Sequence, residues 1–325
     1  MRYYIIAGER SGDLHGSNLV KELKKLDAAA SFRGLGGEEM ERNGVSLLFH
    51  YEQLAFMGFL AVINLFKIAG YMKRCRADVL QYKPDALILI DYGGFNRQMA
   101  KFGKRNNIKV MYYIPPKVWA WRQARAWSLK KNVDQLYVIL PFEKDFYKRY
   151  GMEVNYVGNP VLDAIKSFQP NQNFKQEHQL PQDKKIIALL PGSRKMELER
   201  IVPLMAEVAR QNLHHQFVVA AVDNLPQSLY EPLKSLVNVK FVYNQTYDLL
   251  LLARSAVVTS GTATLETALL KVPQVVVYKA GGLEYSIAKS VVKVKFISLV
   301  NLIANREVVK ELIQEEANPA RLQQE

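Results

Sequence analysis

The stretch A-V-V-T-S-G-T-A-T-L-E-T-A-L-L (residues 256–270) joins a short apolar run to a helix-like segment through a loop of Ser, Gly and Thr. Such a strand, loop and helix predict an α/β fold, and the free N–H groups at the helix start favour an anion, above all a phosphate. The same sequence is also compatible with an ordinary helix that is capped by Ser260 or Thr262 and binds no ligand. This stretch therefore predicts the local structure and leaves the ligand open.

The same alternation of apolar runs and helix-like segments continues along the whole chain. Near-continuous apolar strands between helices predict parallel sheets that are covered on both faces, and hence an α/β protein with doubly wound sheets. The predicted strands are residues 3–7, 87–90, 110–114, 136–139, 186–190, 217–221, 240–242, 256–259 and 274–278.

A segment rich in Pro, Asn and Gln divides this series of strands. It predicts a Rossmann-like domain over residues 1–165, a linker over 166–183 and a second Rossmann-like domain over 184–325. In open parallel sheets, ligands bind at the carboxyl ends of the strands. We therefore expect the site in a cleft between the two domains.

The 325 residues include 44 Lys and Arg against 31 Asp and Glu, a formal net charge of +13. This surplus favours an anionic partner, such as nucleic acid, anionic lipid headgroups or a phosphorylated substrate. A single cysteine, Cys75, excludes an internal disulfide and a Cys-based zinc site, and the five His show no metal-ligand spacing, so no metal is predicted. Without a signal peptide or an apolar run of roughly 18–20 residues, a cytoplasmic protein, soluble or peripheral, is expected.

Two polar loops of the first domain contain candidate site residues. A-G-E-R-S-G-D-L-H-G (residues 7–16) follows the first strand and matches neither G-x-G-x-x-G nor a Walker loop. Glu9 and Asp13 could contact substrate hydroxyls there, although Asp13 or Ser11 could equally cap a helix that begins at Leu14.

Asp91 comes directly after the strand 87–90, where general bases are found at the carboxyl edge of a sheet. The alternative is that Asp91 caps the helix that starts near Phe95. Asn96 can serve as that cap instead, which would leave Asp91 free for catalysis.

Two further stretches of the first domain combine apolar or aromatic residues with basic ones. Residues 54–72 are apolar all round, which usually means a buried helix but also suits a surface that enters an anionic membrane. Residues 112–131 interleave the three Trp with Lys and Arg, as single-stranded nucleic acid sites and lipid interfaces do. Because Rossmann-type architecture is no known RNA module, we favour the lipid interface.

The second domain contains another loop suited to an anion, P-G-S-R-K-M-E-L-E-R (residues 191–200). Gly192 and Ser193 form a tight turn, and Arg194 projects where it could bind a diphosphate and stabilise a leaving nucleotide. A surface Arg paired with Glu197 is the ordinary alternative. Together with Ser260 and the loop that follows, this predicts a diphosphate site, in which Glu266 would accept from sugar hydroxyls.

Ten motifs in order resemble those of the lipid-A-disaccharide synthase family, which are inverting glycosyltransferases of the GT-B fold. They are A-G-E-x-S-G-D-L-H-G (from 7), G-G-x-x-M (36–40), M-G-F (57–59), D-x-x-x-F-N (91–96), Y-Y-I-x-P-K-V-W-A-W (112–121), L-P-F-E (140–143), Y-V-G-N-P (156–160), L-L-P-G-S-R-K-x-E (189–197), S-G-T-A-T-L-E (260–266) and N-L-I-A-N-R-E (301–307).

The resemblance implies transfer of a diacylglucosamine from UDP to the 6-hydroxyl of diacylglucosamine 1-phosphate, at the cytoplasmic face of the Gram-negative inner membrane. The product would be the β-1,6 disaccharide of lipid A, a part of lipopolysaccharide, and UDP. Neither a cofactor nor a metal would be needed. The partners would be the two lipid substrates and the anionic membrane, with no nucleic acid, and homo-oligomerisation stays open.

The resemblance also assigns roles to residues of this chain. Asp91 would be the base, with Glu9 positioning substrate and Arg194 stabilising the diphosphate. The substrate-binding residues would be Ser11, Asp13, Asn96, Gly192, Ser193, Ser260, Gly261, Thr262, Ala263, Thr264, Glu266 and Asn301, and the residues that meet acyl chains or membrane would be Met57, Phe59, Leu60, Ile63, Leu65, Phe66, Trp119 and Trp121.

The chain departs from the family pattern in several places. Gly93 replaces a usual Pro, so a looser loop after Asp91 is expected, Arg10 replaces a small residue, Ala61 an acidic one, and Pro115 precedes the usual Pro116. The family's last C-terminal helices, which follow N-P-x-R-L, are expected to be absent from this chain. A UDP-N-acetylglucosamine 2-epimerase-like enzyme and a non-catalytic lipid- or nucleic-acid-binding protein of the same fold are the alternatives.

Overall fold

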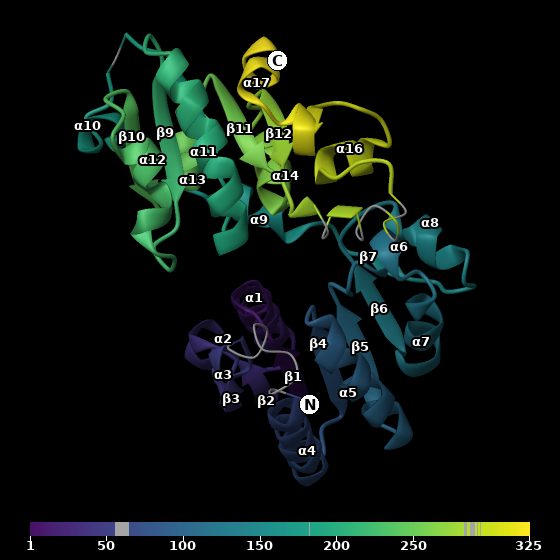
Figure 1. The fold of residues 1–325 in the computed structure, drawn as a ribbon. Helices are drawn as coiled ribbons and strands as arrows, with labels where there is room; N and C mark the ends of the chain where they lie inside the picture. Colours follow the sequence, from purple (N-terminus) through teal and green to yellow (C-terminus); the bar gives the residue numbers. More distant parts are fainter. Residues whose placement is uncertain (56–64, 182, 283–284, 287–289, 291, 293) are drawn as a thin grey trace. The chain divides into compact units, whose positions relative to one another are not determined.

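The computed structural model describes residues 1–55, 65–181, 183–282, 285–286, 290, 292 and 294–325, and its two compact units are Met1–Pro160 (unit 1) and Val161–Glu325 (unit 2). Each unit is built on one parallel sheet that helices cover (Figure 1). The prediction of doubly wound parallel sheets is therefore confirmed, and it accounts for the long apolar strands, since both faces of such a sheet are buried.

The sheet of unit 1 has the strand order β3-β2-β1-β4-β5-β6-β7, with every neighbouring pair parallel. In the first strand of the chain, residues 2–7, Tyr3 and Ile5 pack in the core beside Val20. The Tyr4 side chain lies on the opposite face of the sheet, where its hydroxyl donates to Asp78 at 2.8 Å. The strands are β1 (Arg2–Ala7), β2 (Ser31–Gly36), β3 (Val45–His50), β4 (Ala86–Ile90), β5 (Lys109–Tyr113), β6 (Gln135–Val138) and β7 (Asn155–Tyr156).

The helices of unit 1 follow its strands and cover the sheet. Because the strands are parallel, the loops after β1, β4 and β5 reach the same carboxyl edge of the sheet, where ligands bind in this architecture. The helices are α1 (Arg10–Leu26), α2 (Glu38–Arg42), α3 (Glu52–Ala55), α4 (Leu65–Tyr82), α5 (Gly93–Arg105), α6 (Val118–Trp121), α7 (Arg125–Asn132) and α8 (Glu143–Lys148).

The sheet of unit 2 has the order β10-β9-β8-β11-β12-β13, again parallel throughout. Successive residues of its central strand enter two different cores: Leu189 packs with the α11 side and Leu190 with the α13 side. The strands are β8 (Ile186–Leu190), β9 (Gln216–Ala221), β10 (Val239–Tyr243), β11 (Ser255–Thr259), β12 (Gln274–Tyr278) and β13 (Lys310–Ile313).

Ten helical segments of the described residues accompany the sheet of unit 2, the first of them starting at the boundary between the units. They are α9 (Pro160–Ser167), α10 (Phe174–Glu177), α11 (Lys195–Gln211), the 3-10 helix η1 (Gln227–Tyr230), α12 (Glu231–Lys234), α13 (Thr246–Leu252), α14 (Thr262–Leu269), α16 (Leu299–Ala304), the 3-10 helix η2 (Gln314–Glu316) and α17 (Pro319–Gln324).

Residues 166–183, which composition predicts as a linker, contribute to the core of unit 2. Phe174 and Leu180 are buried against Ile186 and Leu249. The polar residues around Phe174 and Leu180 conceal this role, because the segment has no apolar periodicity. The compact units meet at Pro160, a few residues before the boundary expected from the sequence.

All nine predicted strands are present, and four more join them: β2, β3, β7 and β13. Of these, β7 has two residues, β13 is half charged and β2 contains two glycines, which hides the strand pattern. In β2, a Cβ on Gly34 would lie 1.8 Å from the Ile5 carbonyl oxygen, so this glycine lets the backbone approach β1. Packing against the central strand decides such segments, and single-residue propensity does not reveal it.

Candidate active site

Asp91 lies directly after β4, at the carboxyl edge of the unit 1 sheet. Asp91 and the next residue, Tyr92, both have a left-handed backbone, each with a φ of 47°. Such a conformation costs a non-glycine residue roughly 1–3 kcal/mol, and residues that keep it gather at functional sites. The end of β5 holds the turn: the Tyr112 hydroxyl donates to the Asp91 carbonyl at 2.7 Å, and the Asp91 amide donates to the Tyr113 carbonyl at 3.3 Å.

The environment of the Asp91 carboxylate makes it a stronger base. Burial raises the pKa of this carboxyl above its usual range, while the Tyr92 N–H and the Lys117 ammonium group oppose the rise. A carboxylate whose pKa is raised towards the working pH is well suited to accept a proton from a hydroxyl. Lys117 was not singled out from the sequence; its place two residues after Pro115, at the end of β5, is the signal that could have found it.

Asn96 holds the strand ends beneath Asp91. Its Nδ2 donates to the carbonyls of Asp91 at 2.9 Å, Ile90 at 3.1 Å and Ile6 at 3.3 Å. No side chain caps α5, whose N-cap residue is Tyr92, so the expectation that Asn96 or Asp91 caps this helix is wrong. The fully buried Asn96 amide is placed to position Asp91 and to join β1 to β4.

Glu9 and Asp91 belong to the same edge of the sheet. A Cβ on Gly8 would lie 2.1 Å from Cγ of Tyr92, so only glycine lets that ring pack against the end of β1. Burial and then the charge of Glu9 raise the pKa of the Tyr92 hydroxyl, which places Glu9 near the ring that follows Asp91. The two predicted catalytic carboxylates thus flank Tyr92.

Asp13 binds the backbone of the next helix. Its side chain is 2% exposed, and it accepts from the amides of Gly37 at 2.7 Å, Met40 at 3.1 Å and Glu39 at 3.1 Å. Helix α1 begins at Arg10, before Asp13, so the prediction of a cap for a helix starting at Leu14 is wrong. Asp13 caps α2 instead, and these three N–H groups satisfy its carboxylate. Ser11 is exposed in the first turn of α1.

The predicted lipid-facing residues have different fates. Trp119 is 5% exposed and its Nε1 donates to Glu143 at 3.1 Å, so the prediction that this indole meets lipid is wrong: it fills the interior next to β6. Trp121 is 44% exposed, as a surface role requires. Outside the described residues lie Met57, Phe59, Leu60 and Ile63, and the side chains of Leu65 and Phe66 at the start of α4 are likewise not described.

In unit 2, the N-terminus of α14 is open. Gly261 is its N-cap residue and no side chain caps the helix, so the ordinary cap by Ser260 or Thr262 is absent. The Ser260 hydroxyl donates to the Ile297 carbonyl at 2.9 Å, and the buried Thr264 hydroxyl donates to the Gly261 carbonyl at 2.8 Å. The first turn, which begins with Thr262 and Ala263, therefore presents N–H groups that suit an anion.

The second predicted phosphate loop is occupied by a carboxylate of the protein itself. Glu197 accepts from the amides of Ser193 at 3.0 Å and Arg194 at 3.2 Å, and from the Arg194 guanidinium at 3.0 Å. Gly192 has a φ of 109°, which favours glycine, and a Cβ there would lie 2.4 Å from the Glu197 carboxylate. The ordinary ion pair is thus what the structure contains, and Arg194, 81% exposed, is free to turn towards a ligand.

Glu266 sits half-buried one turn into α14. Burial raises the pKa of its carboxyl, and a hydrogen bond from the Tyr247 hydroxyl at 2.8 Å opposes that rise. The Tyr247 ring packs edge-on against Phe168, with ring centroids 5.3 Å apart. Tyr247 therefore fixes the orientation of Glu266. The sequence gives no signal for this pairing, because the two residues belong to different helices, α13 and α14, with β11 between them.

Asn301 has a structural place and does not line an open site. It is fully buried, and its amide donates to the Val309 carbonyl at 2.8 Å and to Glu311 at 2.8 Å, while its oxygen accepts from the Val308 amide at 2.7 Å. The resemblance counts Asn301 among the substrate-binding residues, but its amide is bonded within unit 2. It lies within α16 and ties this helix to β13.

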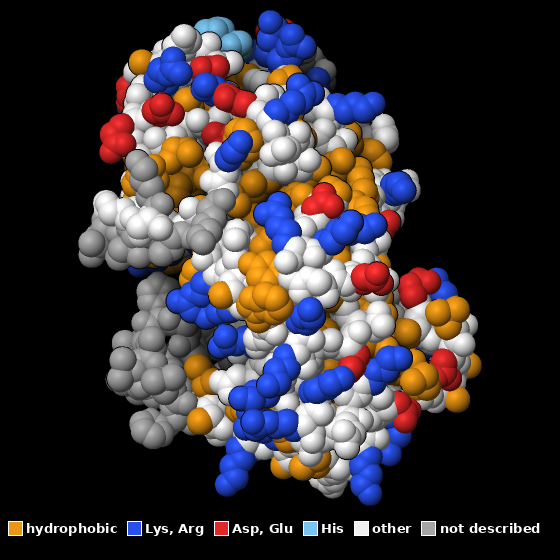
Figure 2. All heavy atoms as spheres, turned by 90° about the vertical axis from the view of Figure 1, so that its right-hand side faces the viewer, with side chains coloured by type: hydrophobic (Ala, Val, Ile, Leu, Met, Phe, Trp, Pro, Cys, Tyr) orange, Lys and Arg blue, Asp and Glu red, His pale blue; other side chains and the backbone are white. Residues whose placement is uncertain are grey.

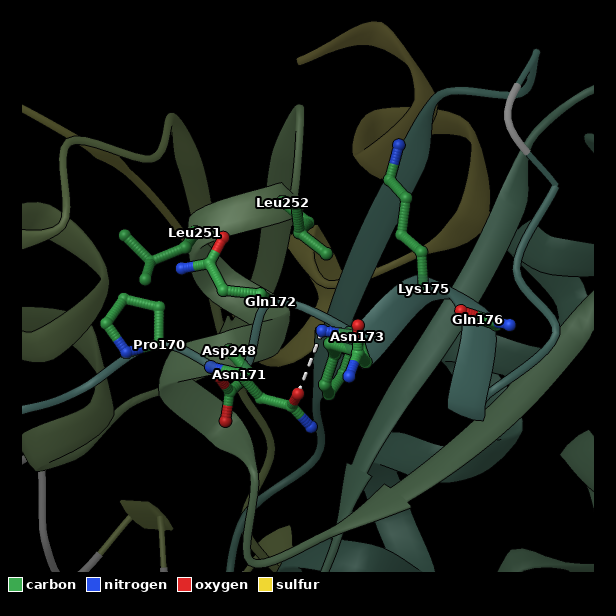
Figure 3. A pocket seen from close by; sticks show the side chains of 10 residues that line it. Pro170, Asn171, Gln172, Asn173, Lys175, Gln176, Asp248, Leu251 and Leu252 are labelled. Atoms are coloured by element: carbon green, nitrogen blue, oxygen red, sulfur yellow. Dashed lines mark hydrogen bonds between the residues drawn. The ribbon is translucent and has the colours of Figure 1, made fainter.

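A polar pocket of about 330 Å³ lies apart from these loops, between α13 and the segment that contains α10. Figure 3 shows Asn171, Asn173 and Lys175 around it, together with Leu251 and Leu252 at the end of α13. No predicted site residue lines it. Asp248 beneath it accepts from the Asn171 amide at 2.7 Å, which anchors the segment before α10.

Among the described residues, no three His, Cys, Asp or Glu side chains gather as metal ligands would. Within the same residues, none of the helices is long and apolar enough to cross a membrane.

Comparison with known proteins points to one family. Residues 3–325 match the family model described as lipid-A-disaccharide synthetase. The chain is 39% identical to the lipid-A-disaccharide synthase of Syntrophus aciditrophicus, over 98% of this chain and 85% of the relative, and 38% identical to that of Nitrosococcus oceani, over 98% and 84%.

Solved structures share the fold at low identity. The UDP-GlcNAc 2-epimerase of Methanocaldococcus jannaschii in complex with UDP-GlcNAc and UDP has a TM-score of 0.65 at 16% identity, covering 99% of this chain and 91% of its own. The glycotransferase of kitacinnamycin has a TM-score of 0.62 at 14% identity, with 99% and 88% covered. These neighbours establish the GT-B fold of the chain.

Proposed function

The chain belongs to the lipid-A-disaccharide synthetase family, glycosyltransferases of lipid A biosynthesis, and from this premise we propose that it condenses UDP-2,3-diacylglucosamine with 2,3-diacylglucosamine 1-phosphate. The products would be the β-1,6-linked disaccharide 1-phosphate and UDP. The observation that carries the proposal is Asp91, a half-buried carboxylate with a raised pKa on a left-handed turn at the carboxyl edge of its sheet.

In the proposed reaction, Asp91 accepts the proton of the acceptor's 6-hydroxyl. The 6-oxygen then attacks C1 of the donor sugar from the face opposite the diphosphate, and the bond between C1 and the diphosphate oxygen breaks. UDP leaves with the electron pair, and the configuration at C1 is inverted. Glu9, on the other side of Tyr92, would hold sugar hydroxyls so that the 6-oxygen faces Asp91.

On the donor side, the open N-terminus of α14 would bind the diphosphate through backbone N–H groups. The Arg194 guanidinium would leave its ion pair with Glu197 and bind the diphosphate. There it would stabilise the negative charge that grows on the leaving group. Glu266, oriented by Tyr247, would accept from the ribose hydroxyls. The N–H groups of α14 and the Arg194 guanidinium supply positive charge at the diphosphate, so we propose a metal-independent and cofactor-free reaction.

The acyl chains and the bilayer would meet unit 1 at residues 57–66, which the family resemblance assigns to lipid. Residues 1–160 include 25 Lys and Arg against 15 Asp and Glu, a surplus that favours an anionic membrane surface. Figure 2 shows Lys and Arg side chains gathered on the face of unit 1 that bears α6, α7 and α8. We therefore propose peripheral binding at the cytoplasmic side of the inner membrane.

The test is incubation of the purified chain with both lipid substrates in detergent micelles, with UDP and disaccharide measured separately. Wild type is expected to form both products in equal amounts, and Asp91→Ala to form neither while it still binds UDP. Turnover by Asp91→Ala would show that another group is the base. No turnover by a folded wild-type chain that still binds the lipids would favour the non-catalytic alternative.

The epimerase alternative has the same fold, and its substrate distinguishes it from the proposed transferase. A 2-epimerase acts on a single soluble nucleotide sugar, so UDP-N-acetylglucosamine alone would be converted to its C2 epimer. We expect no such conversion in the same assay.

A further inference from the structure

One stretch of unit 1 is basic without any acidic residue. Residues 92–133, between Asp91 and Asp134, include ten Lys and Arg and no Asp or Glu. Most of these cations are spread over exposed helix faces, where a solvated charge needs no explanation. Three arginines differ, because the fold brings them together: Arg97 on α5, and Arg122 and Arg125 around the start of α7.

Trp121 organises two of the three. The guanidinium carbon of Arg122 lies 4.4 Å from the centre of the Trp121 ring, and that of Arg125 lies 5.6 Å from the same centre. Stacking of this kind orients a guanidinium and leaves its N–H donors free at the edge. Helix α5, which bears Arg97, packs against α7.

The three charges are close enough to act on one another. Burial, followed by the charges of Arg122 and Arg97, lowers the pKa of the Arg125 guanidinium. No carboxylate among the described residues forms an ion pair with any of the three. By contrast, the nearby Lys104 is paired with Asp134. Like charges held together without a counter-ion are destabilising, which points to an anion supplied from outside.

The cluster belongs to the same sheet edge as Asp91. Arg97 lies in the second turn of α5, the helix that begins two residues after Asp91, and Arg122 and Arg125 follow β5, the neighbour of β4. Tyr112 links the two places: its hydroxyl donates to the Asp91 carbonyl, and the charge of Arg97 acts on the same hydroxyl. Asp91 and the arginines are therefore neighbours of the same tyrosine at one edge of the sheet.

We propose that Arg97, Arg122 and Arg125, held by Trp121, bind the 1-phosphate of the acceptor sugar. This inference rests on the proposed function. C1, which bears the phosphate, and C5, which bears the 6-hydroxymethyl group, are both bonded to the ring oxygen of one pyranose, so a phosphate bound here would hold the 6-hydroxyl within one sugar residue of the cluster, towards Asp91. Two or three guanidinium forks match a phosphate monoester better than lysines would, since each donates a pair of parallel N–H groups.

The experiment compares diacylglucosamine 1-phosphate with diacylglucosamine that lacks the phosphate, both in detergent micelles. In Arg122→Ala/Arg125→Ala, we expect the KM for the phosphorylated acceptor to rise roughly ten- to hundredfold. The KM for the donor and for the phosphate-free acceptor should stay as in wild type. Arg122→Lys/Arg125→Lys, which keeps the charge without the fork, should fall between the two. The matched control is Lys101→Ala/Arg105→Ala, which removes two exposed charges from α5 and should change neither KM.

Two results would overturn the assignment. In the first, the arginine variant keeps the wild-type preference for the phosphorylated acceptor. In the second, it loses binding to phosphatidylglycerol vesicles while that preference is intact, which would make the cluster a headgroup site. Equilibrium binding of both acceptors without donor separates this proposal from the proposed function: if wild type shows no turnover but phosphate-dependent binding that needs the arginines, the site stands and the reaction does not.

Discussion

Gly93 packs directly against the ring of Pro116: a Cβ added to Gly93 would lie 2.8 Å from Cγ and 2.9 Å from Cβ of Pro116. Gly93 is the first residue of α5, directly after the turn of Asp91 and Tyr92, and Pro116 follows β5. The looser loop that we expected from glycine at this position does not form in the structure, because the ring of Pro116 fills the space. The packing of these two residues therefore supports the Asp91 turn.

Gly93→Ala is expected to destabilise unit 1 by roughly 1–3 kcal/mol, because a rigid proline ring cannot move aside at little cost. Gly94→Ala is the matched control, since a Cβ there meets nothing within 4 Å, and it should be neutral or slightly stabilising. Thermal and urea unfolding measure both. Adding Pro116→Ala to Gly93→Ala should recover most of the loss. Equal effects of the two alanine variants would show that helix propensity matters here and the contact does not.

Asp91 should lower stability at the pH at which it works. Its folded pKa is raised above the usual aspartate value of 3.8, so over this interval the folded state keeps a proton that the unfolded state has released. The free energy of unfolding then falls as the pH rises through the interval between these two pKa values, and stays lower above it. Asp91→Asn cannot ionise, so at pH 7–8 it should have a higher melting temperature than wild type, with a smaller difference at pH 4.

The same substitution should remove activity. Turnover is expected to fall by roughly 10²–10⁴-fold in Asp91→Asn, the usual contribution of a general base. In wild type, kcat/KM should decrease as the pH falls through the raised pKa of Asp91. A variant that is more stable at neutral pH and inactive would link the strain of this site to its chemistry. A variant that is less stable at neutral pH would contradict the raised pKa.

Arg194→Ala should affect catalysis without affecting the fold. The guanidinium is 81% exposed and pairs with Glu197 three residues later on the same helix, an arrangement that contributes at most about 1 kcal/mol. If Arg194 stabilises the leaving diphosphate, kcat should fall by roughly 10²–10³-fold. Arg210→Ala breaks an equivalent surface pair with Glu207 in α11 and should leave kcat unchanged.

The two parallel sheets could be predicted from the sequence because their central strands are buried on both faces. Such strands are continuous apolar runs, which are easy to recognise. The site prediction placed Glu9 and Asp91 after strands, and both do lie at one edge of the sheet, while their catalytic roles stay predictions. It failed where polar side chains bind the protein itself. Asp13 and Asn301 stand in loops or motifs that look like ligand sites, and the structure assigns both to backbone amides.

Such failures share a physical cause. A buried carboxylate or amide must find hydrogen-bond partners, and those partners come from segments distant in sequence, such as Gly37 for Asp13 and Val308 for Asn301. The pattern of residue types cannot tell a side chain that is satisfied internally from one that awaits a ligand. Tyr247 and Lys117 were missed for the converse reason: each acts on a site residue through a contact that only the fold creates.

Tyr247→Phe tests whether Glu266 recognises the nucleotide. The change removes the hydroxyl that donates to Glu266 at 2.8 Å, while a phenyl ring can keep the edge-on contact with Phe168. Glu266 then loses the hydrogen bond that opposes its raised pKa, so that pKa should rise further. We expect the KM for the UDP-sugar to increase roughly tenfold, with little change in the KM for the acceptor.

The pH dependence sharpens this test, because an ionised Glu266 accepts hydrogen bonds from ribose hydroxyls and a protonated one accepts fewer. UDP affinity, measured by calorimetry, should begin to weaken at a higher pH in Tyr247→Phe than in wild type. Tyr243→Phe is the control: it removes a hydroxyl that donates to Gln227 at 2.7 Å in the same unit, and it should shift neither quantity. An unchanged UDP affinity in Tyr247→Phe would show that Glu266 does not contribute to donor binding. The diphosphate loops would then be the main contacts of UDP.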